Sequence, residues 1–318
     1  MNENIIEKEL NEVDDNTPKT PEKIVTMKER DMNKMTRKQL ITKIITTTLV
    51  YLFLGFIAVL VLFPFYWMII SSLKDVEEYR RSVPTFFPED PVNGLNNYLD
   101  AFSGANLGTL FLNTVFVGLV STVLSLVITV LSAFAFARLE FKGKNLLFAM
   151  LLATMMIPGE LFTITNYQTV ARLQWQSSFV VLIVPFLVSV FYIYLLRQNF
   201  LQIPNELYLA AKIDGTSDIK YLWKVMIPLS LPTLISITIL KMMGSWNSYM
   251  WPRLVANDDL HKLVTNGLRS AFTVAETGET NYPVQMAAVA IVSAPLFLVF
   301  IFLRKYIMKG VSKSGIKG

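Results

Sequence analysis

Six runs of apolar residues, separated by polar segments, dominate the hydropathy pattern of this chain. They lie at about 44–70, 110–136, 146–165, 179–196, 227–246 and 284–303. Runs of about 20 apolar residues are long enough to cross the hydrocarbon core of a bilayer as helices. Backbone that faces lipid must satisfy its own hydrogen bonds, which favours helices over isolated strands. The pattern therefore predicts an all-α, polytopic membrane protein with six transmembrane helices.

The basic residues indicate how these spans are oriented. Cytoplasmic loops carry an excess of Lys and Arg, and placing both termini in the cytoplasm puts most of the basic residues near the spans on that side, including Arg138, Lys144, Arg197 and Lys212. Since the basic residues lie beside apolar runs, membrane topology explains the net charge of +5 better than binding to nucleic acid does. The chain has no cysteine, which excludes disulfides and thiol catalysis.

The composition divides the chain into three parts. Residues 1–40 are polar, mixed in charge and poor in aromatics, so we expect a largely disordered cytoplasmic tail. The apolar run that follows is too long for a signal peptide, and no cleavage site of small residues comes after it. Residues 41–310 form the predicted six-span domain, with a structured cytoplasmic loop at about 204–222. Residues 311–318 form a short C-terminal cytoplasmic tail.

That loop has the sequence signals of a short polar helix between the fourth and fifth spans. Pro204 suits a first helical turn, and Glu206 lies near the positive helix N-terminus. Gly215 suits a left-handed stop after the helix, and Ser217 can cap the next one. Small residues in the middle of the helix offer a flat surface for a partner. The alternative is an ordinary interfacial helix with one solvated face.

The same stretch resembles the EAA loop of ATP-binding-cassette (ABC) importer permeases, whose pattern is E-A-A-x-x-x-G followed by a spacer and I-x-L-P. The residues that match, the last three more loosely, are Ala210, Ala211, Asp214, Gly215, Ile227, Leu229 and Pro232. The glutamate of the pattern is replaced by Leu209, which removes one anchor to the ATPase that the family uses. Glu206, about one turn earlier, is a candidate substitute.

Other segments resemble the sugar-transport branch of that binding-protein-dependent (MetI-like) family, and most of all the smaller permease of maltose transporters. They include Asn113-Thr114, Ala133 to Arg138, Met156-Ile157-Pro158, Gly244 to Asn247 and Trp251-Pro252. The C-terminus resembles the tail G-x-x-x-G-A-V-K-G of this branch, with Ser314 and Gly315 in place of Gly-Ala. The resemblance covers about residue 44 to the end.

The resemblance implies a cell-membrane permease subunit that imports sugars, of oligosaccharide size, by alternating access. It implies as partners a second permease, two ATPase subunits and an extracytoplasmic sugar-binding protein. The chain has no phosphate-binding loop, so it is expected not to be an enzyme, and the ATPase partners are expected to bind ATP and Mg. The implied coupling residues are Glu206, Ala210, Ala211, Asp214 and Gly215, and the implied C-terminal contacts with the ATPase are Gly310, Gly315 and Lys317.

Two charges within the predicted spans, Glu160 and Lys241, are candidates for the substrate pathway. Charges at membrane depth are costly and usually functional, and similar depth would let these two pair or line one cavity. The alternative is that they lie near the outer interface. Trp246, Asn247 and Tyr249 also suit sugar rings, although an interfacial aromatic belt has the same composition.

Two other functions compete with sugar import. A related importer could carry another solute, such as glycerol phosphate esters or peptides, and the C-terminal tail argues against that. An ion-coupled secondary transporter could use Glu160 and Lys241 as a relay. The absence of an internal repeat and the EAA-like loop argue against this second alternative.

Overall fold

The computed structural model describes residues 37–272 and 280–312, and these residues form helices without a β-strand. The α-helices of the first half are α3 (Arg37–Ser72), α4 (Val76–Tyr79), α5 (Pro91–Gly94), α6 (Asn96–Gly104), α7 (Leu107–Arg138), α8 (Lys144–Thr154), α9 (Thr163–Arg172) and α10 (Phe179–Ile183). Those of the second half are α11 (Val190–Leu201), α12 (Asn205–Ile213), α13 (Asp218–Tyr221), α14 (Ile227–Leu229), α15 (Leu231–Trp246), α16 (Met250–Val255), α17 (Val264–Ala271) and α18 (Tyr282–Ser312). Single 3-10 turns form η1 (Gly159–Phe162) and η2 (Val184–Phe186), and a π-helical turn forms η3 (Leu222–Met226). The expected all-α class is thus confirmed.

The chain separates into two units at Phe65–Tyr66, within α3. In the first unit, every described side chain from Gln39 to Phe65 is exposed, although most of them are apolar. A helix that is apolar on all sides is suited to lipid or to a partner rather than to water. This segment therefore resembles a membrane span whose side chains are not buried by any other described element of its own unit.

The number of spans depends on how bent helices are counted. Among the described residues, three helices are continuous and apolar enough to cross a membrane, namely Gln39–Ser72, Leu107–Arg138 and Tyr282–Arg304. Three further candidates are bent pairs, and counting each pair as one span gives up to six. The pairs are Lys144–Thr154 with Gly159–Arg172 (85°), Phe179–Phe186 with Val190–Leu201 (46°) and Asp218–Leu229 with Leu231–Trp246 (80°).

A proline lies at or near each of these bends. Pro158 lies in the break before η1, Pro185 is the second residue of η2, and Pro232 is the second residue of α15. Proline has no backbone N–H and so removes a helical hydrogen bond. Each of these apolar runs is long enough to span if its bent pair is counted as one span.

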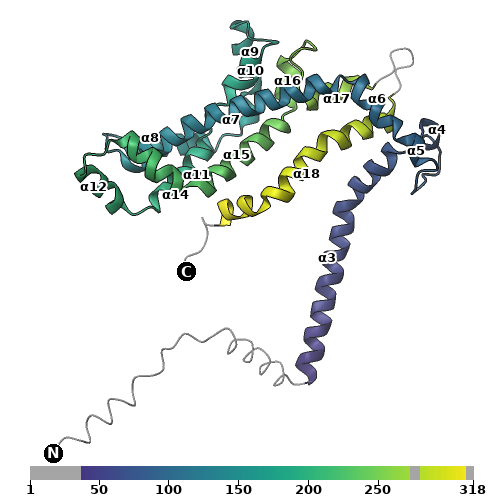
Figure 1. The fold of residues 1–318 in the computed structure, drawn as a ribbon, viewed down its shortest axis with the longest axis horizontal. Coiled ribbons are helices and arrows are strands. Elements are labelled where there is room, and N and C mark those ends of the chain that lie inside the picture. The colour runs from purple at the N-terminus through teal and green to yellow at the C-terminus, as the bar shows by residue number, and fades with distance from the viewer. Residues whose placement is uncertain (1–36, 273–279, 313–318) are drawn as a thin grey trace, which may run out of the picture. The chain divides into compact units, whose positions relative to one another are not determined.

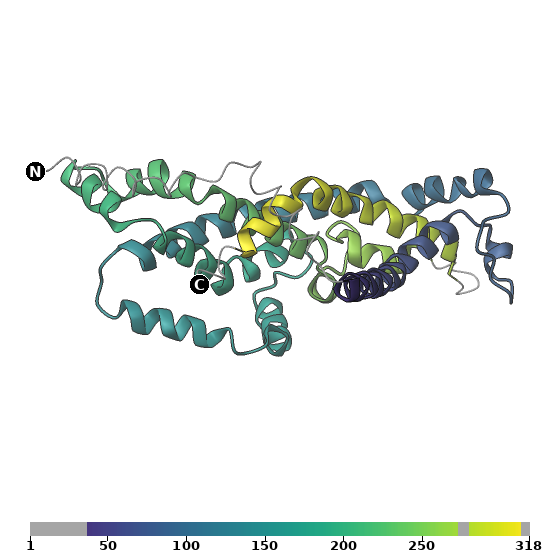
Figure 2. The same ribbon diagram turned by 90° about the horizontal axis from the view of Figure 1, so that it is seen from below.

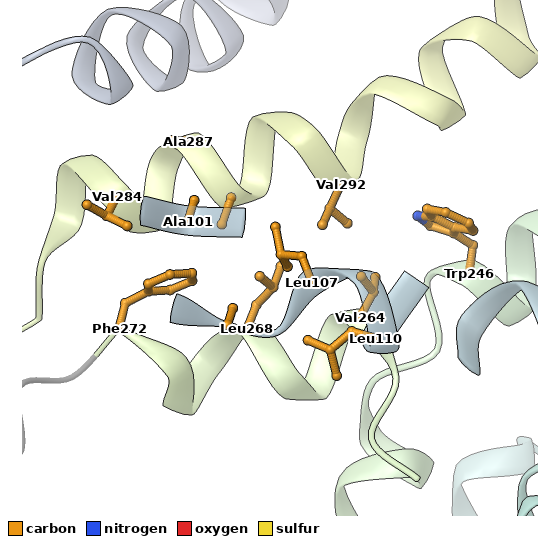
Figure 3. Packing of buried hydrophobic residues seen from close by; sticks show 12 residues of the cluster. Ala101, Leu107, Leu110, Trp246, Val264, Leu268, Phe272, Val284, Ala287 and Val292 are labelled. Carbon is orange, nitrogen blue, oxygen red and sulfur yellow. The ribbon is translucent and has the colours of Figure 1, made fainter. Parts of the chain in front are cut away.

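In the second unit, α7 is the central helix, with α11 and α15 packed against it, and α15 also contacts α18 (Figures 1 and 2). Small and aliphatic residues of α6, α7, α17 and α18 form one buried cluster, with Trp246 at one end (Figure 3). A second cluster joins the C-terminal end of α7 to α11, α13 and η3. A third joins the middle of α7 to α10 and α16. The two candidate sites lie next to the second and third clusters.

Candidate functional site

The first candidate site is the helical turn formed by α12 and α13. Helix α12 ends at Ile213, and Gly215 has a φ of +70°, which confirms the expected left-handed stop. The amide of Thr216 donates to the carbonyl of Ala211 (2.8 Å), and that of Gly215 donates to the carbonyl of Lys212 (3.0 Å). This is the hydrogen-bond pattern of a Schellman motif. Because both bonds need the left-handed residue, Gly215 fixes the direction in which the chain leaves α12.

Ser217 caps α13 as expected, whereas Pro204 lies one position earlier than expected relative to α12. The side chain of Ser217 accepts a hydrogen bond from the amide of Lys220 (3.4 Å), so it caps α13. Pro204 occupies the N-cap position of α12, one residue before the first helical turn. Glu206 lies in that first turn and is exposed.

Arg138, the last residue of α7, ties α12 to that long helix. Its side chain is 7% exposed, and Nη2 donates to the carbonyls of Phe200 (3.0 Å) and Ile203 (2.6 Å). Nη1 donates to Oδ1 of Asn205, the first residue of α12 (3.4 Å). A guanidinium offers several N–H donors in one plane, so it can bind all three acceptors at once. The position of α12 is thereby linked to the end of α7.

A polar cluster joins α12 to α13. Nζ of Lys212 lies 2.7 Å from Oδ1 of Asp218, and the hydroxyl of Tyr208 donates to the same oxygen (2.7 Å). The hydrogen bond to Asp218 raises the pKa of Lys212. Burial, and then the hydrogen bond to Asp218, raises the pKa of Tyr208. Each shift favours the protonated donor, so the cluster keeps its hydrogen bonds at neutral pH.

The two faces of this turn differ in burial. Ala211 and Tyr208 pack against the second buried cluster, whereas Ala210 stays exposed. Apolar side chains at the end of α12 and in η3 are strongly exposed, with Ile213 at 87% and Trp223 at 65%. Leu209, which replaces the glutamate of the EAA pattern, is exposed as well. An exposed apolar patch of this kind marks an interaction surface.

The second candidate site is a cavity of about 360 Å³ enclosed by α7, α10, α11, α15 and α16. Its lining includes Lys241, and Nζ of this residue donates to the carbonyl of Phe186 (2.6 Å). Phe186 ends η2, and α11 begins only at Val190, so this carbonyl faces a break in the helix rather than a following turn. The break thus supplies the one protein acceptor that the structure assigns to the Lys241 ammonium.

Polar groups surround that ammonium. Gly244 and Ser245 follow Lys241 at steps of three and four residues, which places them on the same face of α15, and both line the cavity. Ser248 lies two residues beyond the end of α15 and lines the cavity as well. The cavity is also lined by three further polar side chains, those of Ser121, Ser189 and Tyr192. Trp251 forms an apolar wall, held by a hydrogen bond from its Nε1 to the carbonyl of Val181 (2.9 Å).

The structure separates the predicted substrate-pathway residues. Lys241 lines the cavity, whereas Glu160 is exposed in η1, and no ion pair joins the two among the described residues. Trp246 is buried in the first cluster, 5.6 Å from the ring of Phe111. Asn247 is exposed, and its Nδ2 donates to the carbonyl of Met243 in its own helix (3.0 Å).

The remaining candidates do not line the cavity. The hydroxyl of Tyr249 accepts a hydrogen bond from Nη1 of Arg253, and Tyr249 is not among the lining residues. At the C-terminus, Gly310 lies in α18, while Gly315 and Lys317 lie outside the described residues.

Sequence reasoning missed two features of these sites. It used Arg138 as a basic residue that orients the spans and as the end of a family motif, whereas the contacts of this arginine depend on carbonyls more than 60 positions away. It also missed that Lys241 and Ser245 share a face of α15, for which their spacing of four residues was an available signal. Within the part of the chain that the structure describes, no group of His, Cys, Asp and Glu could hold a metal ion.

Comparison with known proteins shows the family to which the chain is related. Residues 125–313 match the family model described as "Binding-protein-dependent transport system inner membrane component". The chain is 31% identical to the arabinooligosaccharides transport system permease protein AraQ of Halalkalibacterium halodurans, over 85% of this chain and 95% of that protein. It is 30% identical to the sn-glycerol-3-phosphate transport system permease protein UgpE of Pectobacterium atrosepticum, over 83% of this chain and 95% of that protein.

A solved structure has the same fold. It is that of a bacterial ABC transporter involved in the import of the acidic polysaccharide alginate, and one of its chains superimposes with a TM-score of 0.74. The superposition covers 86% of this chain and 98% of that chain, at 23% sequence identity. At this identity the similarity concerns the fold alone.

Proposed function

Because the chain belongs to the binding-protein-dependent transport system inner membrane components, it is a multi-pass membrane permease subunit and not an enzyme, and we propose that its solute is a sugar of oligosaccharide size. The relatives named for arabinooligosaccharides support a sugar. The relatives named for sn-glycerol-3-phosphate support a competing proposal, in which the solute is a small phosphate ester.

The proposed complex contains four kinds of chain. A second, homologous permease completes the translocation pathway, and two ATPase subunits bind ATP and Mg. An extracytoplasmic binding protein delivers the sugar. Both termini lie in the cytoplasm, with residues 1–40 and 311–318 as tails of a permease domain at 41–310. The orientation is supported by the basic residues beside the spans, such as Arg138, Lys144 and Arg197.

The observation that carries the coupling mechanism is the exposure of apolar side chains in α12, α13 and the adjoining η3, which we take to form a free apolar face. Ile213, Ile219 and Trp223 are exposed, and burying them against an ATPase would stabilise the contact by the hydrophobic effect. Ala210 and Gly215 let the partner approach closely, and Glu206 replaces the anchor that Leu209 lacks. Asp214, as the C-cap of α12, ends the helix next to the stop.

Motion of the ATPases then reaches the spans through Arg138. When the ATPases close on ATP, they displace α12 together with its docking face. The three hydrogen bonds of Arg138 oblige the end of α7 to follow, because breaking them leaves a buried guanidinium without partners. Helix α7 packs on α11 and α15, so its displacement changes the cavity between them. The permease is thereby a two-state element biased by ATP and by the loaded binding protein.

The C-terminal residues Gly310, Gly315 and Lys317 are proposed as a second contact with the ATPase dimer. This proposal rests on the resemblance of the tail. Glu160, Trp246, Asn247 and Tyr249 remain proposed pathway residues of lower priority than Lys241, since none of them lines the cavity.

Uptake into vesicles tests the proposed function. The complete transporter is reconstituted, ATP is enclosed with the ATPase side, and import of labelled oligosaccharides is measured with and without the binding protein. We expect import that needs ATP and persists when ionophores remove ion gradients. Import that follows a proton or sodium gradient without ATP would identify a secondary transporter. ATP-dependent import of glycerol phosphate esters, with no import of sugars, would identify the other solute class.

A further inference from the structure

We propose that the cavity beside Lys241 binds an anionic group, a carboxylate or a phosphate, that the transported sugar carries. This inference rests on the proposed function and narrows its substrate class from sugars in general to acidic sugars. It is carried by the charge of the cavity, by the hydrogen bonds already made around Lys241 and by the groups that surround it.

The lining of the cavity carries a single charged side chain, and its charge is positive. Lys241 is the only Lys, Arg, His, Asp or Glu among its lining residues. Within the described part of the chain, no carboxylate forms an ion pair with Lys241. The ammonium therefore brings a positive charge to the cavity that no described side chain neutralises. A charge at membrane depth costs several kcal/mol unless it is paired or hydrated, which makes a negatively charged ligand the favourable partner.

The ammonium also has hydrogen-bonding capacity left. It has three N–H donors, and the structure assigns one acceptor to them, the carbonyl of Phe186. That bond fixes the direction of the side chain across the break between η2 and α11. The other donors remain for a ligand in the cavity. Ammonium-to-carboxylate and ammonium-to-phosphate bonds are charge-assisted and stronger than bonds between neutral groups.

The surrounding groups fit an acidic sugar rather than an inorganic ion alone. Ser245, one turn after Lys241 in α15, and Ser248, just beyond the end of that helix, add hydroxyls to the lining, and Tyr192 contributes a phenol from α11. Hydroxyls both donate and accept, so they suit the hydroxyls of a sugar ring. Trp251 adds an apolar wall whose position is fixed by its own hydrogen bond. The cavity volume of about 360 Å³ is within the range of small-molecule sites.

A purely structural role for Lys241 makes a different prediction. If the lysine only satisfied the carbonyl of Phe186, its loss would weaken the protein and lower import of every sugar alike. A neutral donor such as glutamine would then replace it well. Recognition of an anion requires the charge itself, so only arginine would replace it. The ratio of acidic to neutral import therefore separates the two roles.

The test uses matched pairs of substrates in vesicles that contain the complete transporter. Each pair is a tri-uronate and its methyl ester, which keeps the rings and linkages and removes the charge. A second panel pairs a sugar phosphate with the free sugar, which distinguishes phosphate from carboxylate. The variants are Lys241→Met, Lys241→Gln and Lys241→Arg. Lys142→Met, an exposed lysine in the turn before α8, is the control for loss of a positive charge.

We expect the wild-type protein to import the acidic member of at least one pair about tenfold to hundredfold better than its neutral partner, as one charge-assisted bond allows. Lys241→Met and Lys241→Gln should abolish this preference, while Lys241→Arg and Lys142→Met should keep it. Import of neutral sugars alone, or an unchanged preference in Lys241→Met, overturns the inference and leaves sugar import standing. Failure to import either member of every pair, with ATP-driven import of another solute class, overturns the inference together with the proposed function.

Discussion

Gly215 offers the sharpest test of the proposed coupling helix. Its φ of +70° lies in the left-handed region, and a Cβ built on it meets no atom within 4 Å. The Cβ of alanine, valine or asparagine therefore introduces no clash, and we expect the cost of each substitution to come mainly from backbone conformation. The substitutions Gly215→Asn, Gly215→Ala and Gly215→Val form a series of increasing strain, because asparagine tolerates this region and a β-branched residue does not.

The size of the effect follows from that backbone cost. A left-handed conformation costs an ordinary L-residue roughly 1–2 kcal/mol, and valine more. One or two kcal/mol changes the ratio of closed to open turn by about 5- to 30-fold. When the turn opens, the amides of Gly215 and Thr216 lose their bonds to Lys212 and Ala211. The chain then leaves α12 in another direction, and the free apolar face no longer has one orientation toward a partner.

The assay measures sugar import and ATP hydrolysis in the same vesicles and reports import per ATP hydrolysed. We expect this ratio to fall in the order wild type, Gly215→Asn, Gly215→Ala, Gly215→Val, with normal amounts of protein in the membrane. Gly143→Val is the matched control. Gly143 has a φ of +80° and equally open surroundings, and it lies at the start of α8, outside the α12–α13 turn.

Two results would refute this reasoning. If Gly215→Val hydrolyses ATP and imports sugar as the wild type does, the turn has no coupling role. If Gly143→Val lowers the ratio as much as Gly215→Val, the effect comes from general backbone strain rather than from the position of α12.

Three further predictions concern the same machinery. Arg138→Met removes charge-assisted bonds of about 1.5–3 kcal/mol each, so thermal stability and import per ATP should both fall; Arg138→Lys should recover only part, and full activity of the methionine variant would contradict the tether. Since the pKa of Lys212 is raised, its stabilising contact is complete below the ordinary lysine value and is lost only as pH rises above about 10.4. Import per ATP should thus be constant from pH 6 to 9. A fall in this pH range that disappears in Lys212→Met would show that the Lys212 contact is lost at much lower pH than predicted. Deletion of residues 312–318 should weaken assembly with the ATPase or change its basal hydrolysis, and normal co-purification and turnover of the truncated complex would make the tail passive.

The sequence determined the all-α membrane class of the protein, because the length of a span and the hydrogen bonding of its backbone in lipid are local requirements. Apolar runs of about 20 residues predicted the helices without any knowledge of their packing. The stop at Gly215 was equally local, since a glycine after a helix and a capping serine at Ser217 act within one turn. Prolines near the three bends were also present in the sequence, at Pro158, Pro185 and Pro232, although hydropathy alone did not predict that these spans bend.

Tertiary structure decided which of these residues act together. Arg138 reaches carbonyls of a different helix, and Lys241 reaches the carbonyl of Phe186, 55 positions away in the sequence. Periodicity could not predict these contacts, because they depend on how α7, α11 and α15 pack. Trp246 is the opposite case. Its aromatic side chain suited a sugar site, but packing places it in the first buried cluster. Local sequence therefore specified the helices, their ends and their breaks, while side chains were brought together by packing over long separations.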